Sequence, residues 1–164
     1  MSDGPLISLT VCMRDAEHWV DHCLESLVKQ TYRPLEIIAV DDGSSDDGYS
    51  KLKAWEGEHN GISVQVLKQP PTGLSAGRNL ALEHSKGEWV AITDIDCRPD
   101  PYWISEMFQV SDGIDGENVF AVTGRTIFEE GTTTTSRLRA QSIARKYTGR
   151  PRLTSLANGP CSMF

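Results

Sequence analysis

The sequence predicts an α/β protein whose mostly parallel sheet carries helices on both faces. Short apolar runs rich in β-branched residues alternate with segments in which apolar residues recur every three or four positions. Two runs, LISLTVC and LEIIAV, are apolar at most positions, which is typical of strands buried on both faces of a parallel sheet. The 164 residues, 38% hydrophobic and 24% charged, fit one folded domain.

Five segments are predicted to be strands. Each is short, rich in β-branched or aromatic residues, and bounded by turn-forming residues. They cover residues 6–12, 35–40, 62–67, 88–93 and 119–123. Because helical segments separate them, these strands are expected to form βαβ units and to pair in parallel.

Five segments are predicted to be helices. They are residues 16–28, a short segment ending at about residue 58, residues 74–86, a segment opened by Pro101, and the Arg-rich stretch 137–150. Asp15, directly before the first of these, is expected to cap its N-terminus. Gly87 is expected to stop the third.

Charge is distributed unevenly along the chain. Residues 1–124 have nine basic against 21 acidic residues, a balance of −12, and residues 125–152 have seven against two, a balance of +5. The total of −7 argues against a general nucleic-acid binder. No apolar run approaches the roughly 18 residues of a membrane span. The basic segment is expected to meet a different partner from the acidic body.

The four cysteines are expected to be small buried side chains in a reducing compartment. They are Cys12, Cys23, Cys97 and Cys161. Their spacing forms no zinc pattern, and their density is too low for a disulfide scaffold. The first residues lead into a strand without a basic signal-peptide region. Together these features favour a cytoplasmic location.

Polar clusters follow three predicted strands, at the edge where open α/β sheets bind ligands. They lie at residues 12–15, 41–44 and 94–96. Carboxylates grouped there repel one another unless a cation is bound. Asp94 and Asp96 point to the same side if the strand continues through them, and two such donors suit Mg²⁺ or Mn²⁺. Taken singly, each cluster is also explained as an ordinary acidic turn or a solvated strand end.

The segment GLSAGRN, residues 73–79, places a glycine-containing turn before a helix N-terminus. The backbone amides there, together with Arg78, favour an anion such as a diphosphate. Glycine and serine also begin helices that bind nothing, so this segment is informative only alongside the acidic clusters.

Four segments in this order resemble glycosyltransferase family 2. They are LISLTVCMRDA, LVKQTYRPLEIIAVDDGSSDDG, GLSAGRNLALEHSKGEWVAITDIDC and NGPCSMF. The resemblance implies a Rossmann-like GT-A fold, with a nucleotide-sugar-binding α/β domain over residues 1–124. Residues 125–164 would form a basic connection and the start of the acceptor-side part, which makes the chain the donor half of a longer enzyme. Such an enzyme moves a sugar from a nucleotide-diphosphate sugar to an acceptor hydroxyl.

The resemblance assigns the first two clusters to the nucleotide. Asp42, with Asp41 beside it, would contact the base. The segment from Cys12 to Arg14 would line the base and the ribose, although Met13 departs from the small polar residue or proline often found there. The expected donors carry UDP, GDP or dTDP.

The remaining matched residues would face the diphosphate and the sugar. Arg78 would face the donor, in a Gly-Arg-Asn that resembles the family's Ala-Arg-Asn. Asp94 and Asp96 would form the Asp-x-Asp motif, with Asp96 as a ligand of Mg²⁺ or Mn²⁺ and Asp94 near the metal, the ribose or the donor sugar. The metal would neutralise charge on the leaving diphosphate.

The sequence assigns neither the general base nor the acceptor. An inverting transfer needs a general base, which the resemblance places beyond Phe164. Glu129 and Glu130 are better explained as an exposed loop pair. A non-catalytic nucleotide-sugar-binding module is therefore an alternative. A Mg²⁺-dependent phosphorelay receiver domain is a weaker one, because its acidic pair should follow the first strand. The acceptor would be a glycan, a lipid-linked molecule or a small molecule, and residues 137–152 would form either a solvated helix or a peripheral contact with the inner membrane face.

Overall fold

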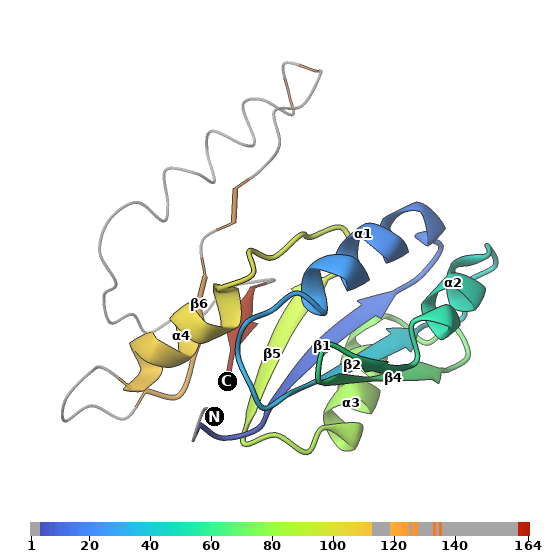
Figure 1. Ribbon diagram of the computed structural model, residues 1–164. Helices are drawn as coiled ribbons and strands as arrows, with labels where there is room; N and C mark the ends of the chain where they lie inside the picture. Colours follow the sequence, from blue (N-terminus) through green and yellow to red (C-terminus); the bar gives the residue numbers. More distant parts are fainter. Residues whose placement is uncertain (1–3, 113–118, 125, 128–132, 134, 136–160) are drawn as a thin grey trace.

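Seven strands form one sheet in the computed structural model, which describes residues 4–112, 119–124, 126–127, 133, 135 and 161–164 (Figure 1). Their order is β3-β4-β2-β1-β5-β7-β6. The strands are β1 (Ile7–Met13), β2 (Leu35–Asp41), β3 (Gly57–His59), β4 (Ile62–Lys68), β5 (Trp89–Asp94), β6 (Val122–Thr123) and β7 (Ser162–Met163).

The centre of the sheet is parallel, as predicted. β1 lies between β2 and β5, and β2 lies between β1 and β4, with all of these pairs parallel. The register places Met13 beside Asp41 and Cys12 beside Asp94. The carboxyl ends of β1, β2 and β5 are therefore level at one edge of the sheet.

Short antiparallel strands extend this centre on both sides. β3 pairs with β4 across the two-residue turn Asn60-Gly61, in which both residues have a positive φ. The short helix predicted to end at about residue 58 is confirmed as α2 (Gly48–Ala54), but its predicted end is wrong, since α2 ends before β3. The strand predicted at 119–123 is confirmed only for β6, which pairs with β7.

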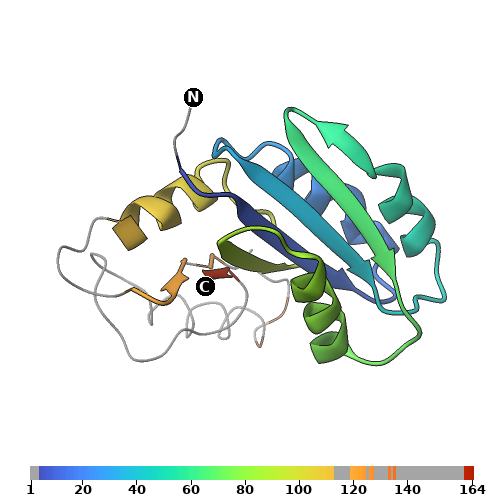
Figure 2. The ribbon, with the colours of Figure 1, turned by 90° about the horizontal axis from the view of Figure 1, so that it is seen from below.

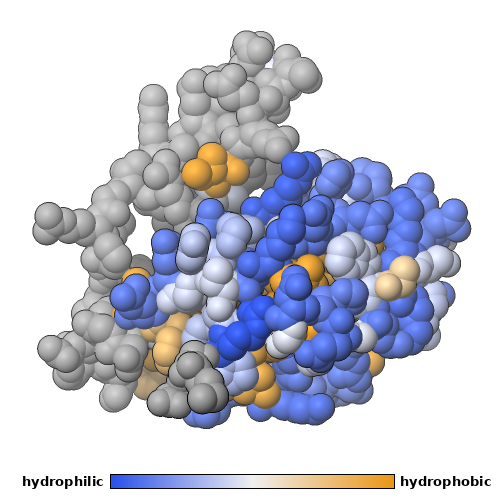
Figure 3. Space-filling model, viewed as in Figure 1, coloured by the Kyte–Doolittle hydropathy of each residue, from blue (hydrophilic) through white to orange (hydrophobic). Residues whose placement is uncertain are grey.

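Helices cover both faces of the sheet, as predicted (Figure 2). α1 (Glu17–Leu27), α2 and α4 (Trp103–Asp112) pack on one face, and α3 (Leu74–His84) packs on the other. The outer sides of α1 and α2 carry mainly hydrophilic residues, as expected for helices whose apolar side faces the sheet (Figure 3). In the part of the chain that the structure describes, no helix is long and apolar enough to cross a membrane. The helix predicted over 137–150 lies outside that part.

Side chains alternate along each strand, so the two faces have separate cores. The larger core lies under α1, α2 and α4 and includes Leu9, Leu24, Leu52 and Ile104, all fully buried. The smaller core lies under α3 and contains Cys12, Ile38, Val40 and Ala81. Because β1 contributes to both cores, packing on its two faces fixes its last residues at the edge of the sheet.

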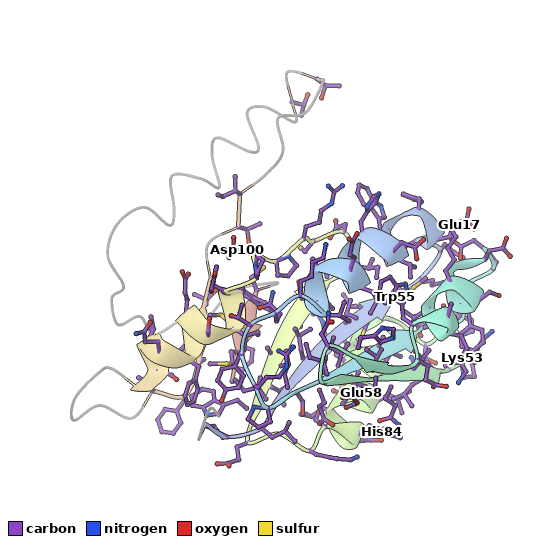
Figure 4. All side chains as sticks on the ribbon, viewed as in Figure 1. Glu17, Lys53, Trp55, Glu58, His84 and Asp100 are labelled. Atoms are coloured by element: carbon purple, nitrogen blue, oxygen red, sulfur yellow. The ribbon has the colours of Figure 1, made fainter. Side chains whose placement is uncertain are left out.

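The first helix is capped by a neighbouring loop, so the prediction that Asp15 caps it is wrong. α1 begins at Glu17, which lies beside α2 in Figure 4 and whose N–H donates to Oδ2 of Asp46 at 2.9 Å. Asp15 has a left-handed φ of 48°. Its Oδ1 accepts from the N–H and the hydroxyl of Ser45 at 2.7 and 2.9 Å. Asp15 stands two residues before the helix, and its carboxylate therefore joins the loop after β2.

Gly87 has a packing role and not the helix-stopping role predicted for it. α3 ends at His84. A Cβ on Gly87 would lie 2.6 Å from the backbone nitrogen of Ser8, so only glycine permits this approach to β1. The Gly87 N–H donates to Oγ of Ser8 at 2.8 Å, and that hydroxyl donates to Glu36 at 2.6 Å. This buried network fixes the chain between α3 and β5.

Candidate functional site

A cavity of about 440 Å³ opens at the carboxyl ends of β1, β2 and β5, beside the N-terminal end of α3. Its lining residues are Cys12, Met13, Arg14, Asp42, Gly73, Leu74, Asp94, Ile95 and Asp96. Five of the seven residues predicted from the sequence thus surround one cavity. It lies at the edge where parallel sheets bind ligands.

Asp41 lies outside the cavity and stabilises the turn beside it. Its side chain is fully buried, and both carboxylate oxygens lie 3.3 Å from the N–H of Ser44. Its backbone carbonyl accepts from the N–H of Gln69 at 3.0 Å. Of the two adjacent aspartates, Asp42 alone reaches the cavity, and Asp41 holds the turn after β2.

Asp42 presents a carboxylate that protein donors already hold in place. The residue is 3% exposed. Its Oδ1 accepts from Nε2 of Gln69 at 2.6 Å and from the N–H of Thr72 at 2.8 Å, and its Oδ2 accepts from the N–H of Gly73 at 2.8 Å. These donors, Gln69 first, hold the pKa of Asp42 below its ordinary value of 3.8, against the opposing effect of burial. Asp42 is therefore an ionised acceptor in the cavity wall.

The loop over residues 69–73 depends on the close approach of Pro71 to Gly43. Gly43 has a φ of 69°, and a Cβ there would lie 2.6 Å from both Cδ and N of Pro71. The hydrogen bonds from this loop to Asp42 were not predicted, because Thr72 and Gly73 act through backbone amides, which leave no side-chain signal. Gln69 did leave a side-chain signal in the sequence, because this polar residue directly follows β4, the strand that pairs with β2.

Arg78 and Asp94 form an ion pair beside the cavity. Nη2 of Arg78 lies 3.0 Å from Oδ1 of Asp94, and each side chain is 35% exposed. The pair joins α3 to the end of β5. A partly exposed pair of this kind contributes at most about 1 kcal/mol to stability, so its position at the cavity is the more informative property.

Asp94 and Asp96 both line the cavity, but the alternation expected to align them is absent. β5 ends at Asp94, and the N–H of Cys97 donates to the Asp94 carbonyl at 3.0 Å, which closes a turn. A turn does not preserve the period of two on which the prediction rests. Asp96 is instead carried on the exposed turn, where the Cys97 thiol contacts its Oδ1 at 3.7 Å.

The cavity suits a metal that takes some of its ligands from a substrate. Among the residues that the structure describes, no group of three or more His, Cys, Asp or Glu side chains is arranged to hold a metal ion. Mg²⁺ commonly uses one or two carboxylates and completes its octahedron with waters and phosphate oxygens. The oxygens of Asp94 and Asp96 fit that mode of binding and do not form a protein cage.

Cys12 contributes a neutral thiol to the cavity wall, because burial raises its pKa to about 11. All four cysteines are free, and Cys12, Cys23 and Cys161 are buried, as predicted. Cys97 is only half-buried. Its interaction with Cys161 lowers the pKa of Cys161 to about 7. The sequence spacing gave no sign of this contact.

The loops after β1 and β2 are joined by a reciprocal set of hydrogen bonds. The N–H of Asp15 donates to Oγ of Ser44 at 3.0 Å, and the N–H of Asp47 donates to Oε2 of Glu17 at 3.0 Å. This network flanks Arg14, whose side chain is half exposed at the cavity. The backbone of Arg14 is thus fixed while its guanidinium is accessible.

The chain belongs to glycosyltransferase family 2, since the family model "Glycosyl transferase family 2" matches residues 8–164. This membership removes the receiver-domain alternative. The fold is that of GT-A glycosyltransferases. It resembles a mannosyltransferase from Pyrobaculum calidifontis, PcManGT, solved with GDP-Man and Mn²⁺, with a TM-score of 0.65 and 24% identity over 73% of this chain and 35% of that chain.

Two similar proteins are glycosyltransferases by name. The Bacillus subtilis protein EpsJ, described as an uncharacterized glycosyltransferase, is 27% identical over 92% of this chain and 42% of its own length. An Escherichia coli protein, the UDP-Glc:alpha-D-GlcNAc-diphosphoundecaprenol beta-1,3-glucosyltransferase WfgD, is 29% identical over 66% of this chain and 40% of its own length. The chain therefore spans less than half the length of these relatives.

Proposed function

We propose that this chain forms the donor-binding part of a glycosyltransferase that uses a nucleotide-diphosphate sugar. The observation that carries the proposal is the cavity at the ends of β1, β2 and β5. It combines an ionised, preorganised acceptor, a half-exposed arginine and two carboxylates on one wall. Family membership, and relatives whose names include UDP-Glc or GDP-Man, support the same assignment.

Each part of the cavity suits one part of such a donor. Asp42 accepts a hydrogen bond from the base, and Cys12 packs beside the nucleoside. Arg14 provides a cation for the diphosphate. Arg78 orients Asp94 through their ion pair. Asp94 and Asp96 would hold Mg²⁺ or Mn²⁺, which neutralises charge on the departing nucleoside diphosphate when bound.

The proposed transfer also needs an acceptor hydroxyl and a general base. Deprotonation of the hydroxyl requires a base. The base is expected beyond Phe164, and Glu129 and Glu130 lie outside the described residues. The acceptor is a glycan or a lipid-linked molecule, which the diphosphoundecaprenol in the name of the Escherichia coli relative supports. The basic residues 137–152 would meet such an acceptor at an anionic membrane surface.

Calorimetric titration of the chain with UDP-, GDP- and dTDP-sugars, with and without Mn²⁺, tests the proposal. We expect one nucleotide class to bind more tightly when the metal is present. Donor hydrolysis, measured separately, distinguishes an active transferase part from a non-catalytic binding module. A folded chain that binds no nucleotide, with or without Mn²⁺, would overturn the proposal.

A further inference from the structure

The two oxygens of Asp42 are not equally available to a ligand. Each carboxylate oxygen has two acceptor sites. Oδ1 fills both with Nε2 of Gln69 and the N–H of Thr72, whereas Oδ2 accepts from the N–H of Gly73 alone. One acceptor site on Asp42 is therefore left for a ligand in the cavity, and it belongs to Oδ2.

Gln69 is fixed so that it must donate to Asp42. Its backbone N–H donates to the carbonyl of Asp41 at 3.0 Å, which places the residue at the end of β2. An ionised carboxylate accepts hydrogen bonds and cannot donate them, so the Gln69 amide must turn its nitrogen toward Asp42. At 2.6 Å this contact is short, as hydrogen bonds to charged acceptors are.

We propose that Gln69 is a positioning residue that sets base selectivity. It occupies Oδ1 of Asp42 and thereby leaves a single acceptor, which favours an imide base of the uracil type over guanine. The inference rests on the proposed function. Uracil offers one N–H, at N3, between two carbonyl groups. Guanine offers two adjacent donors, N1–H and N2–H, which pair best with both oxygens of one carboxylate. Cytosine would turn the lone pair of its N3 toward Asp42.

The test compares the folded wild-type chain with Gln69→Met, which keeps the length of the side chain and removes its donor. Gln65→Met is the matched control, because Gln65 lies on the exposed side of β4. Calorimetry with Mg²⁺ present measures affinities for UDP, CDP, GDP and pyrophosphate. Gln69→Ala is the second variant if Gln69→Met does not fold, as judged by circular dichroism.

We expect the wild type and Gln65→Met to prefer UDP over GDP by about tenfold or more, the discrimination that one unpaired polar group produces. Gln69→Met should reduce this ratio severalfold, mainly because GDP binds better, with pyrophosphate affinity unchanged. If Gln69 had only a structural role, its replacement would lower the affinity for all four ligands by a similar factor. Wild-type UDP binding with an unchanged ratio in both Gln69 variants, or a wild-type preference for GDP, overturns this inference alone. A folded wild type that binds no nucleotide overturns the proposed function and this inference with it.

Discussion

Four aspartates at the candidate site have four different surroundings. Asp41 is buried and holds a turn, Asp42 is fixed by three donors, Asp94 is paired with Arg78, and Asp96 is exposed on a turn. Sequence reasoning groups them because they follow neighbouring strands. It cannot separate Asp42 and Asp94 from the others, because the partners of these two come from residues 69–73 and from α3, distant in the chain. The differences predict distinct effects of mutation.

Replacing Asp96 should affect ligand binding and leave stability unchanged. Asp96→Asn removes a metal-binding charge from an exposed turn, where a substitution usually changes the free energy of unfolding by less than about 0.5 kcal/mol. We expect metal-dependent donor affinity to fall at least tenfold, about the effect of losing one charged contact. Calorimetry and urea unfolding measure the two effects. Extensive unfolding would instead indicate a structural role.

Replacing Asp42 should make stability less dependent on pH. Its donors lower the pKa of Asp42 in the folded chain, so the carboxylate adds stability at pH values above its ordinary pKa of 3.8. That contribution is lost as the pH falls through the lowered value, and Asp42→Asn lacks it throughout. The difference in unfolding free energy between wild type and variant should be constant at neutral pH and shrink below about pH 4. Denaturant unfolding across pH 2–7 measures it, and a difference that stays constant to pH 2 contradicts the assignment.

At the scale of elements, the run DDGSSDDG (residues 41–48) has two separate structural roles. Its first half ends β2 and supplies Asp42 to the cavity. Its second half supplies Asp46, whose Oδ2 accepts from the N–H of Glu17 and whose Oδ1 accepts from the N–H of Gly48, both at 2.9 Å. One carboxylate thus serves the N-terminal ends of α1 and α2. Asp15 is the α1 cap that the sequence predicts, because a cap is normally local, and no local pattern reveals a cap supplied by another loop.

Asp46→Ala should destabilise the fold, and Asp47→Ala should not. Loss of an N-terminal cap costs about 0.5–2 kcal/mol, and Asp46 serves two helices, so a loss of about 2 kcal/mol is expected. Asp47 is exposed and contributes its backbone N–H, which alanine retains. Urea unfolding of the two variants gives the comparison. Equal losses would show that Asp46 is not a shared cap.

Gly77 in α3 is a position where alanine should stabilise the fold. A Cβ there would lie 3.5 Å from Sγ of Cys12 and 3.7 Å from Cγ1 of Val40, ordinary contact distances. Gly77→Ala should raise the free energy of unfolding by about 0.4–1 kcal/mol, because it restricts the unfolded chain and favours the helix. Gly43→Ala is the opposite control, since φ is positive there and Pro71 is in the way. Thermal unfolding measures both, and a less stable Gly77→Ala would mean that α3 cannot accept the methyl group.

At the scale of the whole molecule, the parallel centre of the sheet was predictable and its edges were not. Continuous apolar runs identify β1 and β2, and helical periodicity between strands implies parallel pairing. β3 is three residues long and lacks such a run, although Asn60-Gly61 is a recognisable hairpin turn. β7 has two residues, and its pairing with β5 joins segments far apart in the sequence. The level strand ends, and therefore the location of the cavity, followed from the predicted centre alone.

That distant pairing predicts a specific pattern of hydrogen exchange in β5. The N–H of Val90 donates to the carbonyl of Phe164 at 2.8 Å, and the N–H of Phe164 donates back at 2.9 Å. The Val90 amide should therefore exchange slowly, as an interior strand does and an edge strand does not. Phe164→Pro removes one of these two bonds and should speed Val90 exchange by about twofold to tenfold, while Phe164→Ala keeps the N–H and should have less effect. The Ala91 amide, which alternation turns toward β1, serves as the internal reference. Fast Val90 exchange in the wild type would place β5 at the edge of the sheet in solution, with β7 unpaired.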